Sequence, residues 1–278
     1  MTTEVLRLAA FPLGRKGGNP AGVVLEAGHL SSSEMQQIAA EVGFSETVFI
    51  LSRNGSDIRV KYFSPEMEVD FCGHATIAAG VALGGQYGVG DFVFETNNGP
   101  LKVSVSDSPV GLEAEISTTK ALVSGFEPQE LEQLLDILHL SGAMLAEGFE
   151  PKIANAGNAH PVIVLKSLDL LEQLDYEFEE LKQLCRIRKW ITIQIVAREA
   201  KGIWQSRNPF AFGGVYEDPA TGSAAAALGV YFRELGEIKT GETFTIKQGI
   251  KMGQPCSISV RVGEKECSFS GTAIPLKA

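Results

Sequence analysis

Apolar and polar positions recur along the chain with two different periods, and each period predicts a different element. Within Ser31–Val42, the apolar residues Met35, Ile38, Ala39 and Val42 recur at helical spacing behind serines that can cap a helix. The same reasoning predicts further helices at 128–140, 177–185 and 222–235.

Strands are predicted where β-branched and aromatic residues alternate with polar ones. Residues 47–51 and 58–62 flank the turn Arg53-Asn54-Gly55-Ser56, and Asn-Gly between two such runs is a strong hairpin signal. Residues 92–105 predict a second hairpin, and strands follow at 243–247, 256–262 and 267–274, with a tight turn at 263–265. Many strands with a few isolated helices indicate an α+β fold with mainly antiparallel sheets.

The stretch Phe71–Gly90 is long and uncharged enough to suggest a membrane span. Six of its 20 residues are glycine, however, and His74, Thr76 and Gln86 lie inside it. Because its apolar residues are mostly alanine and valine, insertion into a bilayer would be unfavourable. We therefore predict a helix buried inside a globular domain.

Two pairs of segments resemble each other in the two halves of the chain. Gly73–Val81 aligns with Gly222–Val230 at an offset of 149 residues, and the segment that starts at Asn19 is echoed around His160 at an offset of 139. Both pairs keep the same order, which indicates a duplication. The prediction is two pseudo-symmetric lobes, each a curved sheet around a central helix, with the site in a cleft between them.

Charge and cysteine spacing make several kinds of partner and site unfavourable for this chain. The chain has 278 residues and a net charge of −10, which opposes binding to nucleic acid or to an anionic membrane. No signal peptide is readable, so we expect a cytoplasmic protein. Its four cysteines lack CxxC spacing, which argues against both a disulfide framework and a zinc site.

The residues that could bind a ligand lie where the two repeated helices are predicted to begin. Gly73 and Gly222 stand at these starts, where unpaired backbone N–H groups and the helix dipole can hold an anion. Tight packing is the alternative explanation for both glycines. No His, Asp or Glu cluster shows metal-ligand spacing, so metal-dependent hydrolysis is disfavoured.

Each polar side chain near these starts also has a structural explanation. Asp218 could be a turn or cap residue, His74 a buried core residue, and Glu46 a solvated carboxylate. Cys72 aligns with Thr221 in the repeat. The symmetric mechanism of a two-thiol racemase is therefore excluded.

Four motifs in this order resemble the phenazine-biosynthesis PhzF-like family, which has the diaminopimelate-epimerase-like fold. They are Asn19–Val24, Gly43–Phe49, the segment from Tyr62 to Thr76, and Glu217–Ala224. The resemblance implies lobes at 1–117 and 118–261, with 262–278 returning to the first lobe. It further implies a homodimer that uses no cofactor or metal and isomerises a dihydro-hydroxyanthranilate by proton transfer.

The resemblance also assigns roles to residues. It places the catalytic glutamate at Glu46, supported by His74 and Asp218. The expected substrate-binding residues are Asn19, Gly73, Gly222 and Ser223. The leading hypothesis is a cofactor-independent isomerase of a small carboxylate, with Glu46 as the single acid and base. The alternatives are a racemase or epimerase that uses Cys72 with a non-thiol partner, and a non-catalytic protein that binds a small acid.

Overall fold

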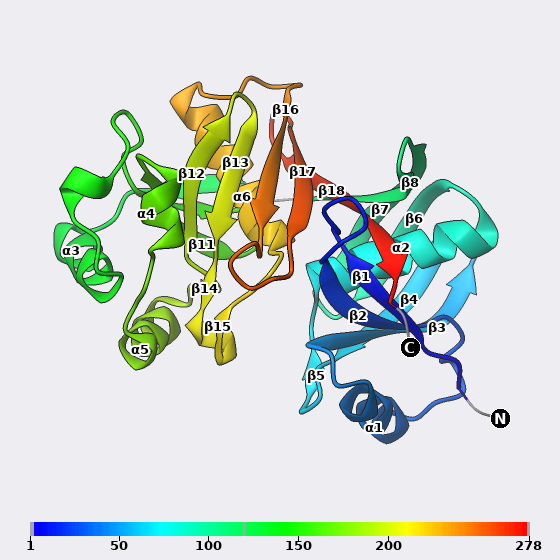
Figure 1. The fold of residues 1–278 in the computed structure, drawn as a ribbon. Helices are drawn as coiled ribbons and strands as arrows, with labels where there is room; N and C mark the ends of the chain where they lie inside the picture. Colours follow the sequence, from blue (N-terminus) through cyan, green and yellow to red (C-terminus); the bar gives the residue numbers. More distant parts are fainter. Residues whose placement is uncertain (1–2, 119–120, 277–278) are drawn as a thin grey trace. The chain divides into compact units, whose positions relative to one another are not determined.

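The computed structural model describes residues 3–118 and 121–276 (Figure 1). Residues 1, 2, 119, 120, 277 and 278, which fall within the predicted lobes, lie outside this description. The chain forms two compact units, of which the first is Met1–Ser117 with Ser270–Ala278 and the second is Thr118–Phe269.

The first unit is a sheet that closes on itself around one helix. Its elements are β1 (Leu6–Ala10), β2 (Asn19–Val24), α1 (Ser32–Val42), β3 (Glu46–Asn54), β4 (Asp57–Phe63), β5 (Glu68–Val69), α2 (Gly73–Tyr87), β6 (Gly90–Thr96), β7 (Gly99–Ser108) and β8 (Gly111–Ser117). The strand order is β1-β2-β3-β4-β6-β7-β8, and the final strand β18 (Cys267–Pro275) pairs with both β8 and β1. This closure leaves no free edge between β8 and β1.

The strands of the second unit pair in the order β9-β10-β11-β12-β13-β16-β17, and β17 also pairs with β18. The strands are β9 (Leu122–Ser124), β10 (Lys152–Asn155), β11 (Ala159–Leu165), β12 (Gln194–Ala200), β13 (Ile203–Arg207), β16 (Thr243–Gln248) and β17 (Cys256–Val262). The helices are α3 (Pro128–Ile137), α4 (Leu168–Glu172), α5 (Phe178–Arg188) and α6 (Gly222–Leu235). A separate ribbon of β14 (Pro209–Phe210) and β15 (Val215–Glu217) leads into α6.

Strand pairing repeats between the two units. In the first, the pairs along β1-β2-β3-β4-β6-β7 are antiparallel, parallel, antiparallel, parallel and antiparallel. The pairs along β10-β11-β12-β13-β16-β17 follow the same order. In each unit the central helix lies in sequence between the fourth and fifth of these strands. The predicted α+β fold of two pseudo-symmetric, mostly antiparallel lobes is confirmed.

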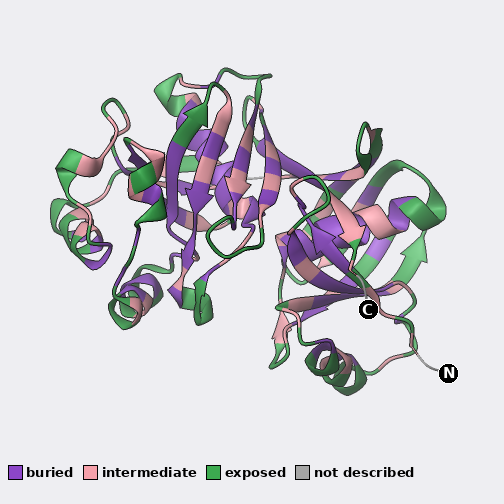
Figure 2. Ribbon diagram, viewed as in Figure 1, coloured by how far each residue is buried: buried purple, intermediate pink, exposed green. Residues whose placement is uncertain are grey.

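The central helices α2 and α6 are the most buried helices of their units (Figure 2). Glycine lets them approach the sheets closely, because a Cβ at Gly80 would lie 2.9 Å from the Ala114 Cβ atom. A Cβ at Gly229 would lie 3.0 Å from a Val260 methyl. The predicted buried helix within 71–90 is confirmed as α2, Gly73–Tyr87, whose buried residues lie between His74 and Gly84, whereas residues 85–90 are exposed. Within the described residues, no helix is long and apolar enough to cross a membrane.

The caps and turns predicted from the sequence are present at most helix and strand ends. Ser31 caps α1 in a reciprocal capping box with Glu34, and Gly55 turns the β3–β4 hairpin with a φ of 63°. Helix α5 continues beyond the predicted end at 185 to Arg188. It stops there because Lys189 adopts the left-handed conformation, with a φ of 58°.

Candidate active site

Three predicted chemical groups meet in the first unit, at the start of α2. Glu46 is the first residue of β3, Cys72 occupies the cap position of α2, and His74 lies in the first turn of that helix. The Glu46 Oε2 atom lies 3.5 Å from the His74 Nε2 atom and 3.5 Å from the Cys72 Sγ atom. The Cys72 Sγ atom lies 3.2 Å from the His74 Nδ1 atom. A carboxylate, an imidazole and a thiol are thus within mutual reach.

The His74 and Glu46 side chains differ in their exposure to solvent. The His74 side chain is 7% exposed, whereas the Glu46 side chain is 21% exposed. The Ser45 hydroxyl lies 3.4 Å from His74 Nε2 and adds a fourth polar group. The carboxylate is therefore the member of the cluster that a ligand reaches most easily, with a buried imidazole behind it. Such a carboxylate can accept a proton from a bound carbon acid and return it.

Asp218 lies in the second unit, between β15 and α6. Its backbone N–H donates to the Asn208 carbonyl at 3.1 Å, and its own carbonyl accepts from Gln248 Nε2 at 2.7 Å. The Thr221 hydroxyl donates to Asp218 Oδ2 at 2.6 Å. These contacts fix the turn before α6, so Asp218 has a structural role whatever its part in chemistry.

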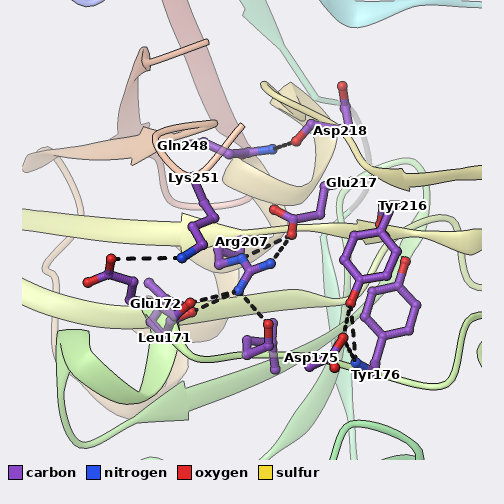
Figure 3. Close-up of polar contacts among 11 residues, drawn as sticks. Leu171, Glu172, Asp175, Tyr176, Arg207, Tyr216, Glu217, Asp218, Gln248 and Lys251 are labelled. Atoms are coloured by element: carbon purple, nitrogen blue, oxygen red, sulfur yellow. Dashed lines mark hydrogen bonds and ion pairs between the residues drawn. The ribbon is translucent and has the colours of Figure 1, made fainter. Parts of the chain in front are cut away.

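A buried ion pair holds the strand that precedes Asp218 (Figure 3). Arg207 Nε donates to Glu217 Oε1 at 3.0 Å, and the Arg207 Nη2 atom contacts the same oxygen. Arg207 Nη1 donates to the carbonyls of Leu171, Glu172 and Leu174. Both side chains are less than a tenth exposed, at 9% and 5%. The pair therefore ties β15 to β13 and to the end of α4.

Ser223, in the first turn of α6, contacts a histidine of the same unit. Its Oγ atom lies 3.0 Å from His160 Nε2, and His160 Nδ1 lies 2.9 Å from Thr192 Oγ1. His160 is fully buried, and this burial lowers the pKa of its imidazole to about 4. The imidazole is therefore neutral near pH 7. It fixes the position of the Ser223 hydroxyl.

The remaining predicted residues have clear structural surroundings. A Cβ at Gly222 would lie 2.2 Å from the Phe269 ring, so packing alone accounts for glycine there. Gly73 is the first residue of α2. Asn19 begins β2 opposite Ala10 and is 2% exposed. The structure brings together Glu46, Cys72 and His74 in the first unit, whereas Asp218, Gly222 and Ser223 belong to the second.

The sequence did not show which side chains of these sites would contact one another. Glu46 and Cys72 are 26 positions apart, so their ligand-type atoms show no recognisable spacing until the chain folds. Arg207, Thr192 and Gln248 were also missed, because each acts through a partner on another strand or turn. Of the residues that had not been singled out, Glu217 lies in the last motif and His160 lies in a segment that the repeat had marked.

Comparisons with known proteins agree with the resemblance. A profile of the PhzC-PhzF family, described as phenazine biosynthesis-like protein, matches residues 8–278. An uncharacterized isomerase, YddE of Escherichia coli K12, is 30% identical over 291 residues, which covers 99% of this chain and 97% of that protein. The trans-2,3-dihydro-3-hydroxyanthranilate isomerase of Pseudomonas fluorescens is 32% identical over 250 residues, covering 86% and 82%.

A solved structure gives the same result for the fold. The PhzF-family phenazine biosynthesis protein of Bacillus anthracis superposes with a TM-score of 0.86 at 28% identity, over 98% of this chain and 96% of that one. The predictions of an enzyme and of the isomerase class are confirmed by these relatives. With a profile that spans nearly all of its residues, the chain belongs to the PhzC-PhzF family of phenazine biosynthesis-like isomerases.

Proposed function

We propose that the protein is a cofactor-independent isomerase in which Glu46 moves a proton within a small carboxylate substrate. The observation that carries this proposal is the partly exposed Glu46 carboxylate, 3.5 Å from the buried His74 imidazole. One carboxylate can take a proton from one carbon and return it to another on the same face of the substrate. The result is isomerisation rather than inversion.

The other site residues support this step in the proposal. His74 orients the Glu46 carboxylate, and the backbone at Gly73 binds the substrate carboxylate at the start of α2. In the second unit, Asp218 takes part in proton transfer, and Gly222 and Ser223 bind substrate through the start of α6. Asn19 completes the substrate-binding set. A homodimer remains a prediction from the resemblance.

A small carboxylate with an acidic C–H bond is the proposed substrate class. Trans-2,3-dihydro-3-hydroxyanthranilate, named for the Pseudomonas fluorescens relative, belongs to this class and is the first compound to test. Because the chain is 32% identical to that relative, a panel of other small carboxylates should accompany it.

Hydrogen exchange in heavy water tests the proposal, because it detects carbon-acid chemistry even when turnover is slow. The wild-type protein should exchange a carbon-bound proton of at least one compound, and Glu46→Gln should lower that rate by roughly 10²–10⁴-fold. Glu41→Gln, an exposed change in α1, is the matched control and should keep the wild-type rate. A Glu46→Gln protein that exchanges at the wild-type rate would refute the role of Glu46.

A second candidate function is a racemase or epimerase in which Cys72 acts with a non-thiol partner. The observation that favours it is the 3.2 Å distance between the Cys72 Sγ atom and the His74 Nδ1 atom, because an adjacent imidazole can activate a thiol. Inversion at a stereocentre would distinguish it from isomerisation. Chiral chromatography of the product measures that outcome.

A further inference from the structure

The cluster of Glu46, Cys72 and His74 has a property that proton transfer does not use. Its three side chains offer one carboxylate oxygen, one sulfur and one imidazole nitrogen, all within 4.8 Å of one another. We propose that this cluster binds a zinc-class divalent cation, and that the bound cation blocks the proton transfer assigned to Glu46.

Two of the three distances fit a tetrahedral ion. Zinc bonds of ~2.3 Å to sulfur and ~2.0–2.2 Å to nitrogen and oxygen separate the ligand atoms by about 3.3–3.6 Å at tetrahedral angles. With His74 Nε2 as the nitrogen ligand, the Glu46–His74 and Glu46–Cys72 separations are both 3.5 Å. The Cys72–His74 separation is 3.9 Å. This last distance must shorten by a few tenths of an ångström. The His74 ring must also turn for Nε2 and Sγ to bind one ion, because Sγ lies closer to Nδ1, at 3.2 Å, than to Nε2.

The three ligand atoms determine which cations the cluster prefers. Thiolate and imidazole favour zinc and similar borderline metals, whereas magnesium and calcium prefer oxygen ligands alone. Three protein ligands leave a fourth position open to water or to an inhibitor. The partly exposed Glu46 carboxylate, 21% accessible, leaves that side of the cluster open to an entering ion.

The repeat provides an internal comparison. Cys72 and His74 correspond to Thr221 and Ser223 in the second unit, where hydroxyls replace the thiol and the imidazole. Neutral hydroxyls are poor zinc ligands, so we expect one site per chain. All four cysteines are buried, but among the described residues only Cys72 lies in such a cluster of possible ligands. Burial raises the pKa of the Cys185 thiol to about 12. Cys72 is thus the thiol expected to respond to the metal.

When the metal binds, it replaces the proton of the Cys72 thiol. The Cys72 S–H bond breaks, a sulfur–metal bond forms, and the proton leaves to solvent. The Glu46 oxygen that binds the metal can no longer accept a substrate proton. The inhibition therefore rests on the proposed function, but metal binding does not, so the two can fail separately.

Cobalt(II) and cadmium(II) titrations test the site, because thiolate ligation produces charge-transfer absorption that oxygen ligation does not. The wild-type protein should bind one ion with such a band and lose it on adding a chelator. Cys72→Ala and Cys72→Ser should abolish the band and weaken zinc binding by roughly tenfold or more. Cys185→Ala and His139→Gln are controls that should keep both, since neither residue belongs to the cluster.

Each outcome separates the proposals. A wild-type protein with no thiolate band, or a Cys72→Ala protein that binds zinc as tightly as wild type, overturns the metal site. If zinc binds through Cys72 and hydrogen exchange continues at full rate in the saturated protein, the site stands but the blocking effect and the role of Glu46 fail. Circular dichroism of both Cys72 variants establishes that a lost band is not caused by unfolding.

Discussion

The Nδ1 atom of His74 lies 3.2 Å from the Sγ atom of Cys72, while the other ring nitrogen of His74 lies 3.5 Å from a Glu46 oxygen. One buried imidazole therefore contacts both the group that an isomerase would use and the group that a thiol-dependent racemase would use. The two candidate functions share a positioning residue and differ in which neighbour exchanges the proton.

Replacing Cys72 by alanine distinguishes the isomerase from the thiol-dependent racemase. If Glu46 carries the proton, Cys72→Ala should keep the hydrogen-exchange rate within a few-fold of wild type, because the carboxylate and the imidazole remain in place. If the thiol is the acid or base, the rate should fall by roughly 10²-fold or more. Cys185→Ala, which removes a buried thiol in the second unit, controls for lost packing. A collapse of the rate in Cys72→Ala alone would favour the racemase.

His160 should make stability depend on pH. The unfolded imidazole binds a proton near pH 6.5, whereas in the folded protein burial lowers its pKa to about 4. Protonation therefore favours the unfolded chain, and the His160 contribution to stability is lost as pH falls from about 6.5 to about 4. The stability difference between wild type and His160→Gln should shrink by about 2–3 kcal/mol between pH 7 and pH 4.5. Urea unfolding at both pH values measures it.

His139 supplies the control for this experiment. It is half exposed and lies 3.3 Å from Glu177, and because an exposed pair contributes little to stability, His139→Gln should leave the unfolding free energy at pH 7 nearly unchanged. An unchanged difference between wild type and His160→Gln would show that the folded protein holds His160 with an ordinary pKa. In that case the buried contact with Ser223 would not be maintained in solution.

Removing Arg207 should destabilise the second unit strongly. Arg207→Met leaves the Glu217 carboxylate buried without its partner, which costs about 3–5 kcal/mol of unfolding free energy. The double variant with Glu217→Leu removes both charges and should recover most of that loss. Lys102→Met, at an exposed ion pair, should leave the unfolding midpoint nearly unchanged. A double variant as unstable as Arg207→Met would mean that the three carbonyl contacts dominate.

Two adjacent glycines of α2 should respond to alanine in opposite ways. A Cβ at Gly84 would lie 2.6 Å from a Val105 methyl, so Gly84→Ala should destabilise the protein by about 1–3 kcal/mol. Gly85 is exposed, with its nearest neighbour at 3.9 Å, so Gly85→Ala should stabilise the helix by about 0.5–1 kcal/mol. Thermal unfolding measures both changes. Equal effects would show that α2 packs less tightly against β7.

Local chemistry explains why most elements were predictable from the sequence. The capping box of Ser31 and Glu34, the Asn54-Gly55 turn and the small-residue runs of α2 and α6 each act within a few residues. The repeat between Gly73 and Gly222 also revealed the two-lobed fold, because a duplication preserves the positions that pack a central helix against its sheet. Helix ends were less certain, as the left-handed Lys189 shows.

The periodic elements, the duplication and the family motifs that include Glu46, His74 and Asp218 could be predicted from the sequence. The contacts of Glu46 with Cys72 and His74, of Arg207 with Glu217, and of His160 with Ser223 became visible only in the folded chain. The two groups of features differ in how far apart in the sequence the interacting residues lie. Caps, turns and periodicity depend on near neighbours, whereas these contacts join residues on different strands and helices, which only the packing of each sheet around its helix brings within a few ångströms.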